Sequence, residues 1–217
     1  MLHDENDEED DIPRLSAETL AALQEFYLEE EQRNMEEDAA ISSTNTNMPK
    51  EDWQLSQFWY DEGTARTLAN ECISSVGENG RVAFISSPTI FAKLKELHPD
   101  ISSNSVCLEY DRRFSSIFGL NYIFYDYNEP LNLPESLKSS FDLVVLDPPF
   151  LSEECLEKSA KTAQYLTNGK ILLCTGTVME DAAYRLLNVK RLKFTPKHSN
   201  NLSNEFSCFS NFDTKLL

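Results

Sequence analysis

The chain has 217 residues, which is enough for one α/β domain with a sizeable core. Its 37 acidic and 19 basic residues give a formal net charge of −18, and its acidic first residues are unlike a signal or transit peptide. There is no run of 18 apolar residues, so we expect no contact with a membrane.

The negative charge is concentrated in the N-terminal part of the chain. Residues 1–52 hold 17 acids and 3 bases, a net charge of −14, whereas residues 53–217 hold 20 acids and 16 bases, a net charge of −4. An acidic arm repels phosphate backbones and favours a basic protein partner, although a solubilising tail is the simpler interpretation. We therefore expect no nucleic-acid partner.

The composition divides the chain into an N-terminal extension and one main domain. We predict a disordered acidic tail over 1–14, a helix over 15–33, a polar linker over 34–50 and the main domain over 51–217. Ser16 suits the N-cap of that helix, whose apolar face either packs on the domain or docks a partner.

An aromatic segment opens the main domain. Trp53 and Trp59 lie within ten residues that also include Phe58 and Tyr60, and these rings form either a lid, a wall beside a cofactor, or plain cover for the core. A helix should follow over 61–76, where apolar residues recur at helical spacing.

The first strand is predicted over 81–88, together with the loop that ends it. Nucleotide-binding folds usually place a G-x-G-x-x-G turn here, but this chain has Ser86, Ser87, Pro88 and then Thr89. The absence of the glycine-rich turn argues against a dinucleotide cofactor and allows a cofactor without phosphates. We place Ser86, Ser87 and Pro88 in a cofactor site, and we expect Ser87 or Thr89 to cap the helix that starts near Ile90.

Acidic residues end the second and third predicted strands. Glu109 is the first choice, and Asp111 the second, for an acid that accepts both hydroxyls of a ribose. The alternative for these acids is a surface ion pair with Arg112 or Arg113. Asp126, at the end of the third strand beside Tyr127, either accepts from an adenine amine or forms a turn.

The fourth strand carries the strongest motif. Phe141 to Leu146 read as a strand buried on both faces, and Asp147, Pro148, Pro149 and Phe150 end it abruptly. The prolines lack N–H groups and stiffen the turn, so its carbonyls are fixed acceptors beside a carboxylate and an aromatic ring. The alternative is a plain strand-ending turn with a structural aspartate.

The remaining elements complete an alternating α/β pattern. Helix, strand and helix follow over 151–169, 170–177 and 178–188, and two strand-like runs over 189–199 and 204–212 close the chain. Alternation of this kind predicts a mostly parallel sheet with helices on both faces. One basic cluster is visible, and we interpret it as a solvated edge of the last helix and strand, with contact to nucleic acid as the alternative: Arg185, Lys190, Arg191, Lys193 and Lys197.

The cysteine and histidine spacing predicts no metal site. Five cysteines occur without a C-x-x-C pair, and the three histidines are far apart. Each cysteine falls in a predicted helix or strand, which favours reduced core thiols in a cytosolic or nuclear protein.

Several segments together resemble one family, the elongation factor 1-alpha lysine methyltransferases, formerly labelled adenine-specific DNA methyltransferases. The resemblance covers roughly residues 15–212, and the segments are WQLSQFWY (53–60), FYDYN (124–128), DPPFLSEECL (147–156), GKILLCTG (169–176) and the NL-NEF run (201–206). It implies a seven-strand Rossmann-like methyltransferase sheet, mostly parallel with an antiparallel C-terminal strand. It also implies S-adenosylmethionine as cofactor and elongation factor 1-alpha as protein substrate, and we expect a cytoplasmic monomer.

The resemblance also implies roles for the D-P-P-F tetrad. Asp147 and the Pro148 carbonyl would hold a target amine, Pro149 would stiffen the turn, and the Phe150 ring would wall the amine. Relatives often carry Tyr at position 150. A methyltransferase acting on adenine amino groups of DNA or RNA, and a non-catalytic binding module on the same fold, remain alternatives.

Overall fold

A computed structural model of the chain describes residues 48–200 and 202–217. The predicted acidic tail over 1–14, the helix over 15–33 and nearly all of the linker over 34–50 lie outside the described residues, so these remain predictions. The main domain predicted from residue 51 onwards lies within the described part.

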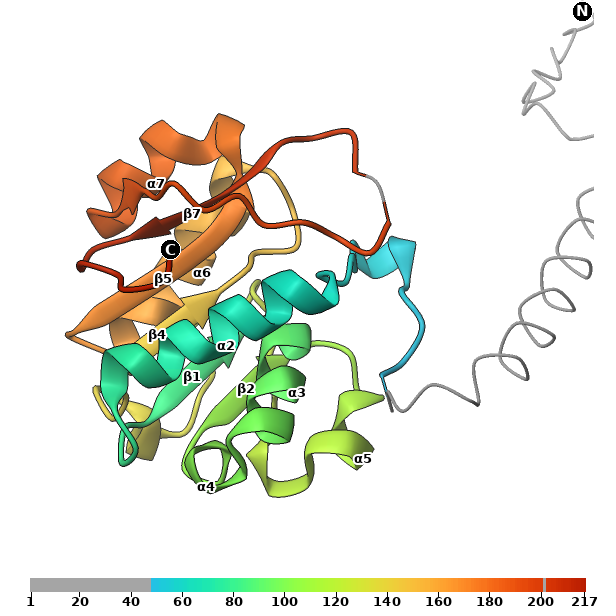
Figure 1. Ribbon diagram of the computed structural model, residues 1–217, viewed down its shortest axis with the longest axis vertical. Helices are drawn as coiled ribbons and strands as arrows, with labels where there is room; N and C mark the ends of the chain where they lie inside the picture. Colours follow the sequence, from blue (N-terminus) through green and yellow to red (C-terminus); the bar gives the residue numbers. More distant parts are fainter. Residues whose placement is uncertain (1–47, 201) are drawn as a thin grey trace, which may run out of the picture. The chain divides into compact units, whose positions relative to one another are not determined.

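Seven strands form one sheet in the order β3-β2-β1-β4-β5-β7-β6 (Figure 1). The strands are β1 (Val82–Ile85), β2 (Val106–Glu109), β3 (Tyr122–Phe124), β4 (Leu143–Leu146), β5 (Lys170–Gly176), β6 (Lys190–Arg191) and β7 (Phe206–Ser210). Strands β1 to β5 pair in parallel, while β7 is antiparallel to both β5 and β6. This is the mostly parallel sheet with an antiparallel C-terminal strand that the sequence predicts.

The helices cover both faces of the sheet. They are α2 (Glu62–Val76), α3 (Pro88–Leu97), α4 (Pro99–Ser102), α5 (Phe114–Phe118), α6 (Glu153–Leu166) and α7 (Glu180–Leu187). Short 3₁₀ turns occupy η1 (Trp53–Leu55), η2 (Gly119–Asn121), η3 (Glu135–Leu137) and η4 (Thr177–Met179). In Figure 1, α2 and α3 lie in front of the sheet and α6 lies behind it.

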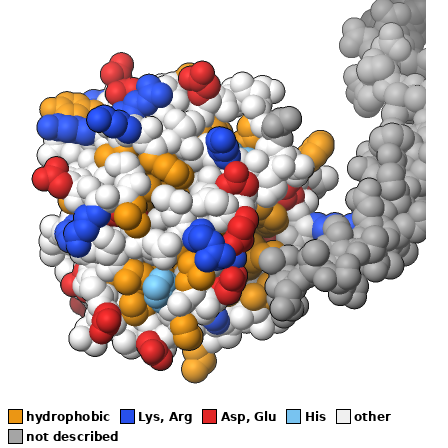
Figure 2. All heavy atoms as spheres, in the orientation of Figure 1, with side chains coloured by type: hydrophobic (Ala, Val, Ile, Leu, Met, Phe, Trp, Pro, Cys, Tyr) orange, Lys and Arg blue, Asp and Glu red, His pale blue; other side chains and the backbone are white. Residues whose placement is uncertain are grey.

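Alternate residues of each strand enter two separate hydrophobic clusters. Phe84 and Val145 pack with α2, α3 and α5 on one face, whereas Ile85 and Leu146 pack with α6 and α7 on the other. Strand β4 is buried along its whole length, because helices cover it on both sides. On the outer surface, acidic and basic side chains are interspersed over the face seen in Figure 2.

Some predicted boundaries were wrong. Helix α3 begins at Pro88 rather than near Ile90, because proline suits the first helical turn. Ser87 occupies the N-cap position of this helix, as predicted, but its side chain makes no cap hydrogen bond; its hydroxyl donates to the Ile85 carbonyl at 2.9 Å. Helix α6 begins at the predicted cap, where the Ser152 hydroxyl accepts from the Cys155 N–H, but it ends at Leu166, before Gly169.

All five cysteines are buried and unbridged, in agreement with their prediction as core thiols. Within the described residues, the helices are too short or too polar to cross a lipid bilayer.

The strand order reverses between β1 and β4. The chain first builds outward from β1 to β2 and β3, and then crosses back to place β4 on the other side of β1. Loops at the carboxyl ends of strands on either side of such a reversal diverge and leave a crevice, where ligands bind in open α/β sheets. A ligand site is therefore expected between the turns that follow β1, β2 and β4.

Candidate active site

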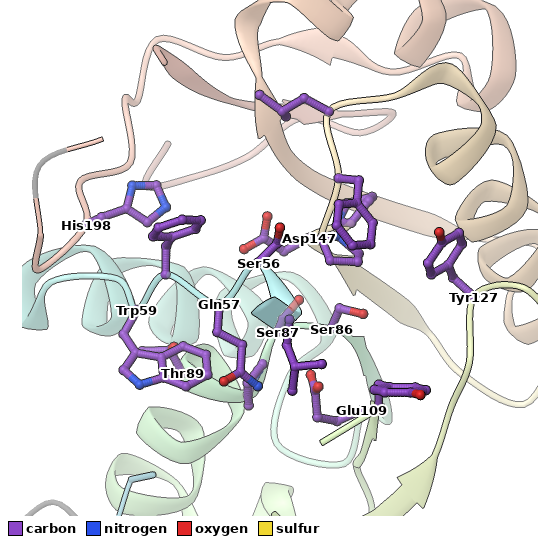
Figure 3. Close-up of a pocket in the computed structure, with 18 of the residues that line it drawn as sticks. Ser56, Gln57, Trp59, Ser86, Ser87, Thr89, Glu109, Tyr127, Asp147 and His198 are labelled. Atoms are coloured by element: carbon purple, nitrogen blue, oxygen red, sulfur yellow. The ribbon is translucent and has the colours of Figure 1, made fainter. Parts of the chain in front are cut away.

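A cavity of about 750 Å³ lies at the carboxyl ends of β1, β2, β3 and β4. This volume is within the range of small-molecule sites. Side chains from the turns after these strands, from the segment before α2 and from the segment before β7 turn into it (Figure 3).

The turn after β1 adopts a conformation that usually needs glycine. Ser86 has φ 51°, in the left-handed region, and its N–H donates to the Leu108 carbonyl at 2.9 Å. A non-glycine residue in this region carries about 1 kcal/mol or more of backbone strain. Ser86 therefore adopts the left-handed backbone conformation that glycine supplies in a glycine-rich loop. The residues that follow it, Ser87, Pro88 and Thr89, line the cavity.

Glu109 ends β2 inside the cavity and is 7% exposed. Loss of hydration is the main cause that raises the pKa of Glu109 to about 7; hydrogen bonds from backbone N–H groups, including that of Asp111, oppose the rise. One carboxylate oxygen accepts from the Asp111 N–H at 3.0 Å. A buried acid of this kind is best stabilised by hydroxyl donors.

Asp147, directly after β4, is held by Tyr60. The Tyr60 hydroxyl donates to Asp147 Oδ2 at 2.7 Å, across 87 positions of sequence. Part of Asp147 opens to the cavity, but its carboxylate lies deep in the protein. Loss of hydration raises the pKa of Asp147 to about 7, the hydrogen bond from Tyr60 lowers it, and the negative charge of Glu109 adds to the rise.

His198 supports Tyr60 from the other side. Its ring lies 4.7 Å from the Tyr60 ring, centroid to centroid, and a β-bridge joins the two residues. The Phe206 ring also contacts His198, at 4.7 Å between centroids and edge to face. The C-terminal part of the chain thus fixes the tyrosine that fixes Asp147, and in Figure 3 Asp147 lies between His198 and Tyr127.

Phe150 and Tyr127 form an aromatic corner at the cavity mouth. Their ring centroids are 5.8 Å apart in an edge-to-face arrangement, and Phe150 is 40% exposed. Asp126 also lines the cavity, while one of its carboxylate oxygens accepts from the Asn128 N–H at 2.8 Å. Both interpretations of Asp126, as a site residue and as a turn former, are therefore compatible with its position.

The aromatic segment before α2 forms a wall of the cavity and also covers the core. Trp59 lines the cavity, packs edge-on against Phe114 at 5.8 Å, and donates from its indole N–H to the Pro49 carbonyl at 2.9 Å. Trp53, by contrast, is 74% exposed and does not line the cavity.

The structure gathers all but one of the residues that the sequence singles out. The cavity lining includes Asp147, Pro148, Pro149, Phe150, Ser86, Ser87, Pro88, Glu109, Asp126, Tyr127 and Trp59. Asp111 is the exception: its carboxylate binds the Arg113 guanidinium at 2.7 Å and the Gln57 amide at 2.9 Å. The ion-pair alternative for this acid is thus the observed arrangement.

Two residues of the site, Tyr60 and His198, have no role in the sequence prediction. In the sequence, Tyr60 is one aromatic residue among several, and His198 is too far from the other histidines to indicate a metal site. No local pattern joins them to Asp147, because the sheet and the C-terminal segment bring them together. Among the described residues, no cluster of three or more metal-ligating side chains is present.

The arrangement suits transfer of a small group to an amine. A fixed carboxylate, two prolines without N–H groups and an exposed ring line one part of the cavity, and the buried acid Glu109 lines another. The acceptors of the first group favour an N–H donor, and the acid favours a diol.

Comparison with known proteins gives two kinds of relatives. A family model described as "Probable N6-adenine methyltransferase" matches residues 51–214. "EEF1A lysine methyltransferase 1" of Gallus gallus is 56% identical over 214 residues, covering 97% of this chain and 99% of that protein. The Homo sapiens protein of the same name is 51% identical and covers 96% of each chain. "Protein-lysine N-methyltransferase EFM5" of Saccharomyces cerevisiae is 37% identical, covering 92% of each.

Solved structures resemble the fold at low identity. A "putative RNA methyltransferase" from Pyrococcus horikoshii has a TM-score of 0.51 at 15% identity, covering 82% of this chain and 97% of that one. The branched-chain polyamine synthase of Thermus thermophilus has a TM-score of 0.50 at 14% identity, covering 81% of this chain and 62% of that one. These likenesses support the Rossmann-like methyltransferase sheet and carry no information on substrate.

Proposed function

The chain belongs to the EEF1A lysine methyltransferase family, and on that premise we propose that it methylates a lysine ε-amine of elongation factor 1-alpha with S-adenosylmethionine. It is a protein-lysine N-methyltransferase, as its relatives at 51–56% identity are named over nearly the whole chain. The observation that carries the proposed site is the Tyr60-held carboxylate of Asp147 at the cavity end of β4.

The residues present fit S-adenosylmethionine. The cavity is large enough for an adenosyl group and its amino-acid arm, and its wall combines aromatic side chains with acids at the strand ends. We assign Glu109 to the ribose hydroxyls, Asp126 to the adenine amine, and Trp59 and Tyr127 to the apolar walls. Ser86, Ser87 and Pro88 bring backbone close to the arm. When bound, the cofactor supplies an electrophilic methyl group on a sulfonium.

The D-P-P-F corner prepares the amine. A lysine in water has a pKa of about 10.4 and carries no lone pair while charged, so the ε-ammonium must first lose a proton to solvent. Entry into the partly dry cavity lowers the pKa of the amine and favours that loss. Asp147 Oδ2 accepts from Tyr60, so Oδ1 is left to accept an amine N–H, and the Pro148 carbonyl accepts a second. Because the corner orients the nitrogen through acceptors only, the lone pair of the neutral amine is directed away from it, towards the rest of the cavity.

The Phe150 ring contacts the methylenes of the target lysine and the methylated amine. This exposed ring, braced by Tyr127, offers a π face to the lysine methylenes and to the methylammonium that forms. Phenylalanine needs only its ring for this role, so no hydroxyl at position 150 is required.

An adenine-amino methyltransferase is the second candidate, and the description of the matching family model favours it. The tetrad fits it chemically, because a ring can stack a flipped base beside amine acceptors. The relatives at 51–56% identity argue for lysine instead, since they cover nearly all of this chain and carry a protein-substrate name. The described domain also holds 17 bases against 22 acids, whereas nucleic-acid affinity rests on many Lys and Arg contacts.

Methyl transfer from labelled cofactor tests the proposal. Purified protein would be incubated with elongation factor 1-alpha, double-stranded DNA and single-stranded RNA in parallel, with Asp147→Ala as the matched inactive control. We expect label in the elongation factor, on a lysine identified by peptide mapping, and its loss with the variant. Label in nucleic acid alone, or undiminished single-turnover methylation by a correctly folded Asp147→Ala protein, would overturn the assignment.

A further inference from the structure

A row of cationic side chains runs from the edge strand β6 towards the cavity. Residues 191–197 lead from β6 to His198, and their burial alternates: residues 191, 193, 195 and 197 are exposed, while 192, 194 and 196 turn inward. Leu192 and Phe194 pack against the hydrophobic core. Three of the exposed positions are cationic, and we name Arg191, Lys193 and Lys197 the cationic row.

The backbone beneath the cationic row is fixed. The Leu192 N–H donates to the Cys208 carbonyl at 2.8 Å, the Lys197 N–H donates to the Thr64 hydroxyl at 3.0 Å, and the Lys197 carbonyl accepts from the Asp61 N–H at 2.9 Å. On the side of the 191–197 segment, all three bonds use main-chain atoms. The charged ends are therefore presented by a rigid segment and are not needed to hold it.

Two members of the cationic row, Arg191 and Lys197, line a second hollow that adjoins the main cavity. This hollow has a volume of about 430 Å³. It shares His198, Leu202, Asn204 and Phe206 with the main cavity. A chain whose lysine enters the main cavity can thus continue directly into the second hollow.

The positive charge of the row is weakly neutralised within the described residues. Arg191 lies 3.8 Å from Glu180, with both side chains largely exposed, and Lys193 has no ion pair among the described residues. Glu205 and Asp61 line the same hollow, and the charge of Lys197 contributes to lowering the pKa of Asp61, after hydrogen bonds from Thr64, so the site is not uniformly basic. Exposed pairs at this distance contribute little, which leaves the cations available to a partner.

Given the proposed function, we infer that the cationic row docks an acidic segment of the protein substrate that flanks the target lysine. The site presents three cations beside the cavity that would take in a single lysine side chain. This number of charges matches a short stretch of polypeptide. A nucleic-acid backbone fits less well, because strong binding of that kind uses six to ten phosphate contacts.

Steady-state methylation of elongation factor 1-alpha by a charge-reversed variant tests the inference. The variant is Lys193→Glu with Lys197→Glu, and the matched control is Lys138→Glu with Lys161→Glu, two exposed lysines that line neither cavity. We expect the KM for the elongation factor to rise about tenfold at low salt in the first variant only, because two attractions become repulsions. The KM for S-adenosylmethionine and kcat should stay within about twofold, and the difference should shrink in 0.5 M salt.

Three results would overturn the inference. The first is an unchanged KM for the elongation factor while the wild-type protein is active, which leaves the proposed function intact. The second is tight binding of a single-stranded RNA probe that the variant loses while its KM for the elongation factor is unchanged. The third is no methylation of the elongation factor by the wild-type protein, which removes the proposed function as well. If the Glu variant fails to bind cofactor by calorimetry, Lys193→Gln with Lys197→Gln replaces it, with an expected rise of about threefold.

Discussion

Replacing Asp147 by asparagine should stabilise the protein at high pH while abolishing methylation. Raising the pKa of a carboxyl from 3.8 to about 7 corresponds to about 4 kcal/mol of free energy that opposes ionisation in the folded state. Since part of Asp147 opens to the cavity, we reduce this to about 2 kcal/mol between pH 5 and pH 8. Asparagine resembles the protonated acid, and its carbonyl can still accept from Tyr60.

The sign follows from proton binding. Between pH 4 and pH 7 the folded state holds a proton at Asp147 that the unfolded state has lost, so the stability of the wild-type protein falls as the pH rises through this window. The asparagine variant lacks this fall. The two free energies of unfolding should therefore nearly meet at the acidic end, diverge up to about pH 7 and run parallel above it.

Urea unfolding at pH 5, 6, 7 and 8, followed by circular dichroism, measures the divergence. Asp100→Asn, at an exposed aspartate, is the matched control and should show no growing difference. A constant difference between wild type and the Asp147 variant at every pH would show that Asp147 does not titrate in this window, and our account of its environment would fail.

Three further changes test the site. Tyr60→Phe removes the hydrogen bond that lowers the pKa of Asp147, so the acidic limb of the kcat/KM profile should move to higher pH and kcat should fall about tenfold; an unmoved limb would contradict the contact. Glu109→Gln should weaken S-adenosylmethionine binding about tenfold by calorimetry at pH 8. Wild-type affinity alone should fall as the pH drops through about 7, where the carboxylate gains a proton; a pH-independent wild-type affinity would argue against the ribose role. Ser86→Val should lower the free energy of unfolding by about 2 kcal/mol while Ser86→Gly leaves it level or higher, and equal effects would argue against left-handed strain.

The fold was predictable because each element carries a local signal. The buried run that becomes β4 has no polar alternation, and its abrupt end at two prolines marks both the strand terminus and the site. Carboxyl ends of neighbouring parallel strands meet at one edge, so the residues after β1, β2 and β4 had to come together.

The rest depended on long-range packing that no local pattern encodes. Glu109 and Asp111 lie two positions apart at the end of the same strand, yet Asp111 binds Arg113 and Glu109 lines the cavity. Their spacing in the sequence makes both acids candidates for binding a ribose. Only the directions of their side chains in the structure distinguish the two. Tyr60 and His198 reach Asp147 from distant segments, so their contribution follows from tertiary structure alone.

The absence of glycine after β1 also has a structural explanation. The turn needs a left-handed residue, and Ser86 supplies it at a cost in strain. The missing glycines therefore say little about whether the turn approaches a ligand, because the backbone conformation that they would favour is present.

A crystal structure of the protein with S-adenosylhomocysteine and a lysine peptide tests the central claim most directly. We predict ribose hydroxyls within hydrogen-bond distance of Glu109, and the lysine nitrogen between Asp147 and the sulfur, with its stem against Phe150. A nucleoside bound outside this cavity, or a lysine that reaches the sulfur without contacting Asp147 or the Pro148 carbonyl, would contradict the account.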